Sequence, residues 1–240
     1  MSKKDEIVIY WSPVSLIERQ TFVNLLWDPP KTLVSVLPPG TGNSSYRSCS
    51  AAKQQFRNTY VVTHPVDNHV VLSGDTENPE VVEGHNAGWF AGRAPLKNHY
   101  RINYDFTWIF FSEESVKIRL TPPYMHNTSD RSSGFIASGA YDISKWFRGI
   151  TITYILWPGV TSLKVSKGDP AFYIEFDTDK KVVLKQFDLN SELLNISTSI
   201  AETNTFVGIQ GLSLQERYQK FTLSNRHKKV LKLIKENLVE

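Results

Sequence analysis

The chain has 240 residues, of which 40% are apolar and 12% are aromatic, so it can bury a sizeable core. Its formal net charge of +3 provides no global field that would favour nucleic acid or an anionic membrane. Cys49 is the single cysteine, which excludes an intrachain disulfide framework. The first residues lack the apolar core of a signal peptide, and no apolar run is long enough to span a bilayer. We therefore expect a cytoplasmic protein without a membrane span.

Residues 1–58 are expected to form an irregular segment packed on the core. Residues 7–11 have a strand-like sequence, but the prolines at 29–30 and 38–39 interrupt any long element that follows. Proline breaks regular structure because it has no backbone N–H and restricts the residue before it. Ser50–Phe56 is expected to form a short helix that ends at Asn58.

The middle of the chain, residues 59–188, is expected to form the β core. Residues 60–63 and 70–72 flank the turn-like residues 65–68, which predicts a hairpin. Glycine and proline breaks over 78–97 predict a long, partly packed loop. Alternating or aromatic-rich apolar patterns predict further strands at 100–111, 116–120, 150–157, 172–176 and 180–187.

Many short strands at close spacing are typical of antiparallel β proteins rather than of βαβ units. We therefore expect a mainly β fold, built as an antiparallel sandwich or as a jelly-roll or β-clip-like barrel. A helical C-terminal segment is expected over residues 189–240, and the three segments are expected to form a single structural domain.

The end of the chain predicts a basic amphipathic helix. Ser224 and Asn225 can cap it, and from Gln215 onward seven Lys or Arg residues stand against three Glu residues, a net charge of +4. The apolar residues of one face are Val230, Leu231, Leu233, Ile234 and Leu238. Such a helix either docks on the sheet with a solvated lysine face, or binds an acidic partner, nucleic acid or a membrane surface.

A histidine-rich turn raises the question of a metal site. His64, Asp67 and His69 lie within six residues, and non-haem iron sites use two histidines and one carboxylate. An iron-dependent oxygenase on a jelly-roll frame would use His64, Asp67 and a later histidine. Ordinary turn chemistry explains Asp67 and its neighbours without any metal, so no metal site is favoured here.

A second stretch carries a short resemblance to an enzyme family. Residues 138–149 read Ser-Gly-Ala-Tyr-Asp-Ile-Ser-Lys-Trp-Phe-Arg-Gly, and Lys-Gly-Asp-Pro follows at 167–170. This pattern resembles the third motif of trimeric dUTPases and dCTP deaminases. The resemblance implies that Asp142 orients water or a sugar hydroxyl. In the nucleotide hydrolase that we consider as an alternative function, Lys145, Arg148 and Arg131 would neutralise a nucleotide phosphate with Mg²⁺ present.

A broader resemblance covers most of the chain. The stretches at 46–51, 56–67, 167–176 and 214–221 are similar, in the same order, to landmarks of an uncharacterised protein family of large tailed bacteriophages, including phages of marine cyanobacteria. The resemblance implies a phage-encoded protein that is made in the cytoplasm of a bacterial host, with the virion as an alternative location. It assigns no activity.

No complete catalytic motif occurs in the sequence, so our first hypothesis is a non-enzymatic binding or assembly module without a cofactor. Its partner is expected to be another protein or a second copy of the chain; a small anionic ligand is an alternative, and nucleic acid is indicated only by the basic tail. Trp108 and Trp157 are expected in the core. Trp146, between Lys145 and Arg148 in a predicted turn, is the expected contact residue. The alternatives are the nucleotide hydrolase and the oxygenase.

Overall fold

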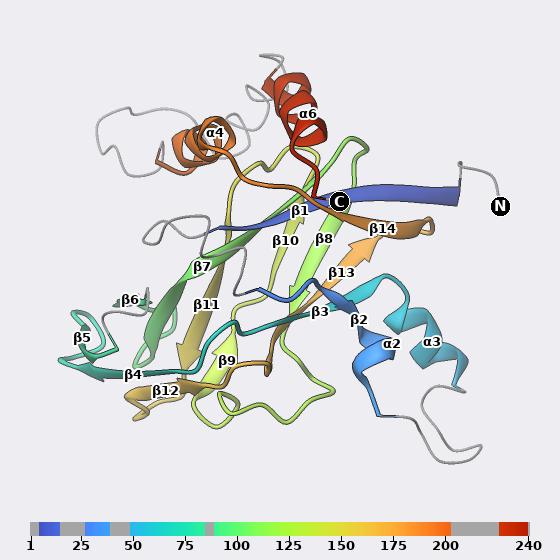
Figure 1. Cartoon of the computed structure of the whole chain (residues 1–240). Coiled ribbons are helices and arrows are strands. Elements are labelled where there is room, and N and C mark those ends of the chain that lie inside the picture. Colours follow the sequence, from blue (N-terminus) through green and yellow to red (C-terminus); the bar gives the residue numbers. More distant parts are fainter. Residues whose placement is uncertain (1–4, 15–26, 39–48, 85–88, 203–225, 240) are drawn as a thin grey trace.

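The computed structural model describes residues 5–14, 27–38, 49–84, 89–202 and 226–239. Over these ranges the fold is mainly β, as the sequence predicts, with its strands arranged in three sheets and with helices on the outside (Figure 1). Within the described ranges, none of the helices has both the length and the apolar character of a membrane span.

Sheet A has six strands and contains the longest strand of the described chain. Its order is β14 (Lys181–Gln186), β1 (Glu6–Val14), β7 (Tyr100–Ser112), β11 (Ile150–Leu156) and β9 (Gly134–Ile136), with β6 (Trp89–Arg93) also paired to β7. All of these pairs are antiparallel except β1 with β14, which is parallel. The segment 1–58, expected to be irregular, thus contributes a nine-residue strand to the interior of this sheet.

Sheets B and C complete the β structure. Sheet B has the order β10 (Gly139–Asp142), β8 (Lys117–Thr121), β13 (Pro170–Asp177), β3 (Thr59–Thr63) and β2 (Lys31–Thr32). Sheet C has the order β12 (Ser162–Val165), β4 (Asn68–Ser73) and β5 (Glu80–Glu83). All pairs in both sheets are antiparallel.

The main core lies between sheets A and B, which face each other as a sandwich. Side chains alternate across each strand, so Trp108 and Phe110 of β7 meet Phe172 and Ile174 of β13, and all four are at most 1% exposed. The rings of Trp108 and Phe172 pack edge to face with centroids 5.2 Å apart. Each large apolar side chain buried in this way contributes about 1.5–3 kcal/mol.

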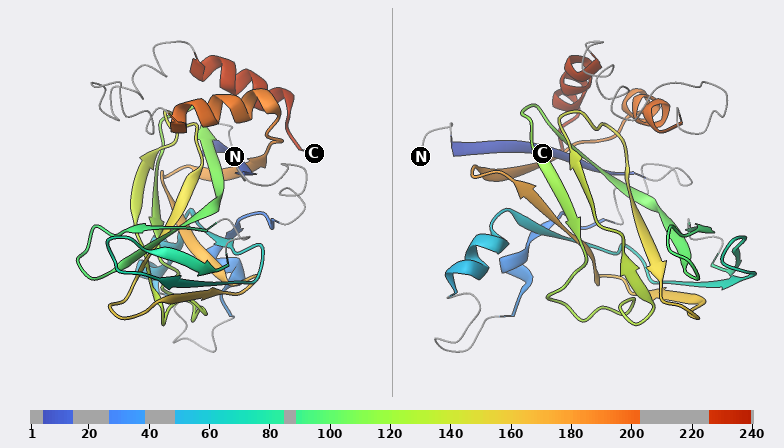
Figure 2. Two further views of the ribbon diagram at one scale, coloured as in Figure 1. Left: turned by 90° about the vertical axis from the view of Figure 1, so that its left-hand side faces the viewer. Right: turned by 180° about the vertical axis from the view of Figure 1, so that it is seen from behind.

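Helices cover the outer faces of sheets A and B (Figure 2). The helices α4 (Ser191–Glu202) and α6 (Arg226–Glu236) lie side by side over sheet A. The short helices α2 (Leu33–Val36) and α3 (Ser50–Phe56) pack on the far side, against sheet B. The short helix predicted over Ser50–Phe56 therefore forms as expected. Asn58, where the helix was expected to end, has a positive φ of 55°.

The basic helix docks on sheet A. Val230 and Ile234 of α6 are 0% exposed and join Phe111 of β7 in one apolar cluster. The lysines of the opposite face are exposed, and Lys235 forms an ion pair with Glu113 at 2.9 Å. The apolar face that the sequence predicts is thus the docking face, while the expected cap at 224–225 lies outside the described residues.

The hairpin predicted over residues 60–72 is wrong. The strand β3 belongs to sheet B and β4 to sheet C, and the chain does not reverse between them. His64 instead donates its backbone N–H to the carbonyl of Asp169 at 2.9 Å and accepts from the N–H of Gly168 at 2.9 Å. A continuous two-stranded ribbon, β3–β4 against β12–β13, therefore bends at this point from one sheet into the other. The turn residues serve that bend.

The loop predicted over residues 78–97 is also wrong in part, because β5 and β6 lie within it. The strand β6 is fixed by backbone pairing with β7 rather than by an alternating side-chain pattern. Its Gly92 faces Arg101 so closely that a Cβ atom there would stand 2.6 Å from the guanidinium. The contacted atom is the far end of a flexible side chain, so this glycine marks a close approach within the sheet without being required by it.

Candidate functional site

The Asp142 carboxylate closes a tight turn at the end of β10. Its Oδ1 accepts hydrogen bonds from the backbone N–H of Ser144 at 3.1 Å and from the Ser144 hydroxyl at 2.6 Å. Its Oδ2 accepts from the Ser115 hydroxyl at 3.3 Å and pairs with the Lys145 ammonium at 2.9 Å. Both oxygens are therefore already engaged by groups of the turn itself.

The electrostatics of Asp142 agree with this structural role. Partial burial acts to raise the pKa of Asp142, but the hydrogen bonds from Ser144 and Lys145 outweigh it and lower that pKa below its ordinary value. A carboxylate held in its charged form by four donors is a strong turn anchor and a weak proton acceptor.

Trp146 and Arg148 follow in the same turn and pack on each other. The guanidinium carbon of Arg148 lies 5.0 Å above the Trp146 ring, and the ring of Tyr141 meets Trp146 at 4.8 Å. Trp146 is half-buried against the main core. The turn thus brings together Asp142, Lys145, Trp146 and Arg148, but largely through contacts with one another.

Arg131 lies elsewhere. It precedes β9, which pairs with the end of β11, whereas Arg148 immediately precedes the beginning of β11. Seven residues at about 3.3 Å each separate the two ends of that strand by about 20 Å. Within one chain Arg131 and Asp142 therefore do not converge on one phosphate.

The three residues of the histidine-rich turn also point in different directions. His64 is 2% exposed and its Nε2 hydrogen-bonds the Tyr154 hydroxyl at 3.0 Å. Asp67 accepts from the backbone N–H of Lys167 at 2.8 Å, and His69 pairs with Glu83 at 3.7 Å on the surface. Over the described ranges of the chain, no group of three His, Cys, Asp or Glu side chains could hold a metal ion.

The end of β11 carries a hollow of about 270 Å³ that we call the aromatic hollow. Tyr124, Phe135 and Trp157 supply its aromatic surface, and Arg131 stands at its exposed side. Trp157 is 42% exposed and Tyr124 is 38% exposed, which is unusual for such large rings. The rings of Phe135 and Trp157 contact each other at 5.1 Å. An open hollow with exposed aromatic walls is typical of a binding site.

The loop that forms the hollow, residues 122–133, is held in place by β13. The backbone N–H of Met125 donates to the Tyr173 hydroxyl at 3.2 Å, and a ring nitrogen of His126 contacts the same hydroxyl. Further along, the N–H and the hydroxyl of Ser129 both donate to Asp169 Oδ2, at 3.1 and 2.9 Å. The loop is thus fixed at two points, so the hollow exists before any ligand arrives.

Polar groups lie buried behind the hollow. Asp130 lines it, is 4% exposed, and receives hydrogen bonds from Thr128 and Tyr154. Burial raises the pKa of Asp130, and it lowers the pKa of His64 to about 4. The contacts Asp130–Tyr154–His64 therefore link the loop of the hollow to the interior.

The sequence prediction for Trp157 is wrong, because this side chain is exposed rather than in the core. The strand β11 ends at Leu156, and Trp157 begins the turn Trp-Pro-Gly that follows, so it leaves the sheet before it can be covered. Tyr124 likewise follows two prolines after β8. An aromatic residue next to proline or glycine at a strand end is the signal that could have located this site, since such residues leave the sheet.

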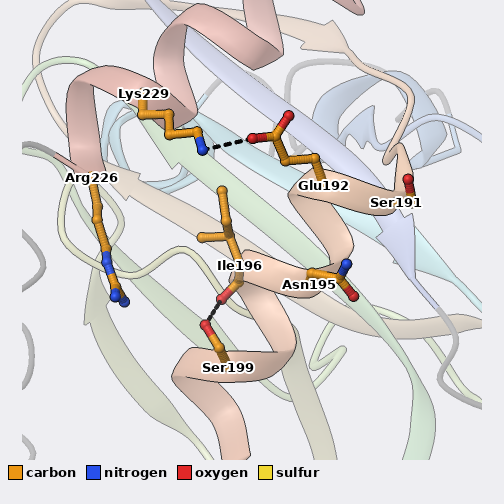
Figure 3. A pocket seen from close by; sticks show the side chains of 7 residues that line it. All are labelled: Ser191, Glu192, Asn195, Ile196, Ser199, Arg226 and Lys229. Atoms are coloured by element: carbon orange, nitrogen blue, oxygen red, sulfur yellow. Dashed lines mark hydrogen bonds and ion pairs between the residues drawn. The ribbon is translucent and has the colours of Figure 1, made fainter.

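Two other hollows contain side chains that satisfy one another. Between α4 and α6, Figure 3 shows Lys229 paired with Glu192 at 2.6 Å, while Arg226 extends away from that pair. On the outer face of sheet B, Arg119 pairs with Glu175 at 3.4 Å. Neither hollow combines exposed aromatic rings with a buried carboxyl, so the aromatic hollow is the candidate site.

Comparisons of the chain with protein-family models, with curated proteins and with solved structures gave no match. The candidate site is therefore defined by its own geometry: a preformed hollow with exposed aromatic walls and one buried carboxyl.

Proposed function

We propose that this chain is a non-enzymatic binding module, and that the aromatic hollow receives a side chain of a protein partner. The observation that carries the proposal is the convergence on one preformed hollow of Trp157 and Tyr124, two of the six exposed large apolar side chains of the described residues. Exposed aromatic rings are the residues from which protein interfaces obtain most of their binding free energy.

The size of the hollow favours a single inserted group. The hollow of about 270 Å³ lies just below the range of about 300–1,000 Å³ for pockets of drug-sized ligands, so it has room for one large side chain. The fixed loop supports the same conclusion, because a preformed hollow orders few groups on binding and so loses little conformational entropy.

The nucleotide hydrolase receives no support from the turn at Asp142. Its carboxylate is engaged by Ser115, Ser144 and Lys145, and Arg131 lies at the other end of β11. The oxygenase likewise has no convergent ligand set among the described residues. The phage origin, with the host cytoplasm or the virion as location, stays a prediction from the sequence resemblance.

The proposal is tested by panning a displayed library of random peptides against the intact chain and against Trp157→Ala. Peptides enriched on the intact chain should bind Trp157→Ala at least about 30-fold more weakly, because removing a central aromatic anchor costs about 2 kcal/mol or more. Equal binding to both proteins would remove the hollow from the binding function.

The matched control is Trp146→Phe, which alters the half-buried tryptophan of the turn at Asp142, about 20 Å away along β11. It should bind the same peptides as the intact chain. If Trp146→Phe loses binding instead while Trp157→Ala keeps it, the contact surface is the turn at Asp142, as the sequence suggested.

A further inference from the structure

Arg131 carries the accessible charge of the aromatic hollow. Of the described residues that line the hollow, Asp130 and Arg131 are the charged ones. Asp130 is 4% exposed and its Oδ1 is covered by the protein, whereas the Arg131 side chain is exposed. The charge that a bound group meets in the hollow is therefore positive.

The guanidinium of Arg131 is largely free to bind a partner. Its Nη1 donates to the His126 carbonyl at 3.5 Å, which is the outer limit of a hydrogen bond. None of the ion pairs among the described residues includes Arg131, whereas Arg57 and Arg119 of the hollow on sheet B are both paired with carboxylates. A guanidinium has five N–H donors in a fork that matches a carboxylate, so Arg131 keeps donors for one.

The two carboxyls behind the hollow do not take the place of that partner. Neither Asp130 nor Asp169 forms an ion pair with Arg131. Burial raises the pKa of Asp130, which disfavours its charged form. Asp169 accepts hydrogen bonds from the N–H and the hydroxyl of Ser129. A carboxylate brought by a partner would therefore complete the pairing of Arg131.

The walls of the hollow suit a large apolar side chain beside that carboxylate. The rings of Phe135 and Trp157 contact each other at 5.1 Å and offer a flat apolar surface. The hollow has room for one such side chain, and Arg131 stands at its exposed side. An apolar anchor with an acidic neighbour matches both features, because complementary charges at the edge of an interface select the partner.

Tyr124 extends this surface beyond the hollow. It lines both the aromatic hollow and the polar hollow on the outer face of sheet B, and its ring is 38% exposed. Its hydroxyl accepts from the side chain of Gln55, an exposed residue of the polar hollow, at 3.4 Å. A segment that continues past its anchor meets this second hollow, whereas a chain terminus would use the first alone.

Resting on the proposed function, we infer that the partner is a protein with an internal segment in which a large apolar side chain enters the aromatic hollow and an adjacent Asp or Glu pairs with Arg131. The apolar side chain supplies most of the affinity. The carboxylate selects among segments that carry such an anchor.

Four peptides test the inference on the unaltered protein. Three have phenylalanine between two copies of glutamate, glutamine or lysine, with acetylated and amidated ends; the fourth is N-acetyl-glycyl-phenylalanine with a free carboxylate. Binding is followed by the NMR signal of the Trp157 indole N–H, assigned with Trp157→Phe. The glutamate peptide should bind about fivefold more tightly than the glutamine peptide, a ratio that corresponds to about 1 kcal/mol. The lysine peptide should be the weakest of the three.

The variant Arg131→Gln removes the charge from an exposed side chain and should abolish the preference for glutamate over glutamine. The matched control is Arg93→Gln, at an exposed arginine that does not line the hollow, and it should keep the preference. High salt should reduce the preference in the unaltered chain, because salt screens exposed charges.

The outcomes separate this inference from the proposed function. Equal binding of the glutamate and glutamine peptides, or preference for lysine, would overturn the acidic neighbour while leaving a hollow that depends on Trp157. A preference that survives Arg131→Gln would overturn the role of Arg131. Tightest binding of the free carboxylate would replace the internal segment by a chain terminus.

The peptide library gives an independent reading. Library peptides that require Trp157 should carry Asp or Glu beside an apolar residue, and their absence would overturn the inference while keeping the binding hollow. If all four peptides leave the Trp157 signal unchanged and the library peptides bind Trp157→Ala equally well, both the inference and the proposed function fail.

Discussion

The two ends of strand β11 carry the same kinds of residues and use them differently. Before the strand, Asp142 and Trp146 are engaged by their own turn, through Ser144, Lys145 and Arg148. At the other end of the strand, the rings of Trp157 and Tyr124 are exposed, and Oδ1 of Asp130 has no donor in the described chain. Side chains that satisfy one another have little left for a ligand, so the first end is a turn and the second is a candidate site.

The comparison shows that the local density of charged and aromatic residues in a sequence does not locate a site. Both ends are rich in them, and the denser end is the self-satisfied one. What distinguishes the second end is that two large aromatic rings, Trp157 and Tyr124, stay exposed there. Stability and binding measured separately at each end of β11 test whether the two ends differ in this way.

The largest expected effect belongs to His64, which lies buried behind the hollow. Burial lowers the pKa of His64 to about 4 from 6.5, although the Asp169 carboxylate acts to raise it. Between these values the unfolded chain binds more protons, so the free energy of unfolding should be complete above pH 6.5 and fall by about 3 kcal/mol as pH drops to 4. Urea midpoints at pH 7 and pH 4.5 measure this loss.

The variant His64→Gln should show a flatter pH dependence than the unaltered chain, and His69→Gln, at a half-exposed histidine, should not. The raised pKa of Asp130 acts in the opposite sense, because a carboxyl that prefers its neutral form when folded destabilises the fold as pH rises. The difference between the slopes of variant and unaltered chain is therefore decisive. Identical slopes would show that His64 titrates normally.

The next effect concerns Gly134, where β9 meets the end of β11. A Cβ atom at this position would stand 2.3 Å from the Ile155 carbonyl oxygen and 2.8 Å from the Leu156 Cα, and both are backbone atoms that cannot move aside. Gly134→Ala should lower the free energy of unfolding by about 2–3 kcal/mol and distort the hollow. Gly159→Ala, where a Cβ would meet no neighbour but φ is +79°, should cost only about 1 kcal/mol.

At the turn before β11, Asp142→Ala should destabilise by about 2 kcal/mol, because it removes an acceptor shared by Ser115, Ser144 and Lys145. Peptide binding should be unchanged. Thermal unfolding checks the first statement and the peptide panel checks the second. A loss of binding without a loss of stability would make this turn the functional end.

The smallest effect on stability is expected for Trp157→Ala, at about 1–2 kcal/mol, because the ring is 42% exposed and only its covered part contributes to packing. Its effect on binding should be the largest of the set. A melting temperature well below that of the unaltered chain would mean that Trp157 serves packing. In that case the two ends of β11 would not differ as proposed.

Much of the fold follows from sequence pattern. Strand β8 has Ile118 and Leu120 inside and Lys117 and Arg119 outside, as alternation predicts, and α6 buries the apolar face that its spacing indicates. These elements are predictable because one face of each is exposed to solvent and the other is buried. The bend at His64 is not predictable in this way, because the same turn residues can form either a hairpin reversal or a bend. Tertiary hydrogen bonds between His64 and residues 168–169 decide between the two.

The candidate site was less accessible to sequence reasoning than the fold. The sequence assigned Arg131 to a phosphate site shared with Asp142. In the structure Arg131 lines the hollow instead. Asp130 carries no sequence signal, because its burial depends on Tyr154 and Thr128 packing around it. A site formed by side chains that the fold leaves exposed can be identified only once the packing of the rest of the chain is known.

The parallel pairing of β1 with β14 has a consequence for how the chain is made. Residues 6–11 of β1 pair with residues 181–186, so this edge of β1 has no partner until three quarters of the chain has left the ribosome. Loop closure over such a distance is slow, and an uncovered apolar strand is prone to wrong pairing. The order of synthesis therefore leaves this edge of β1 open to wrong pairing until β14 has been made.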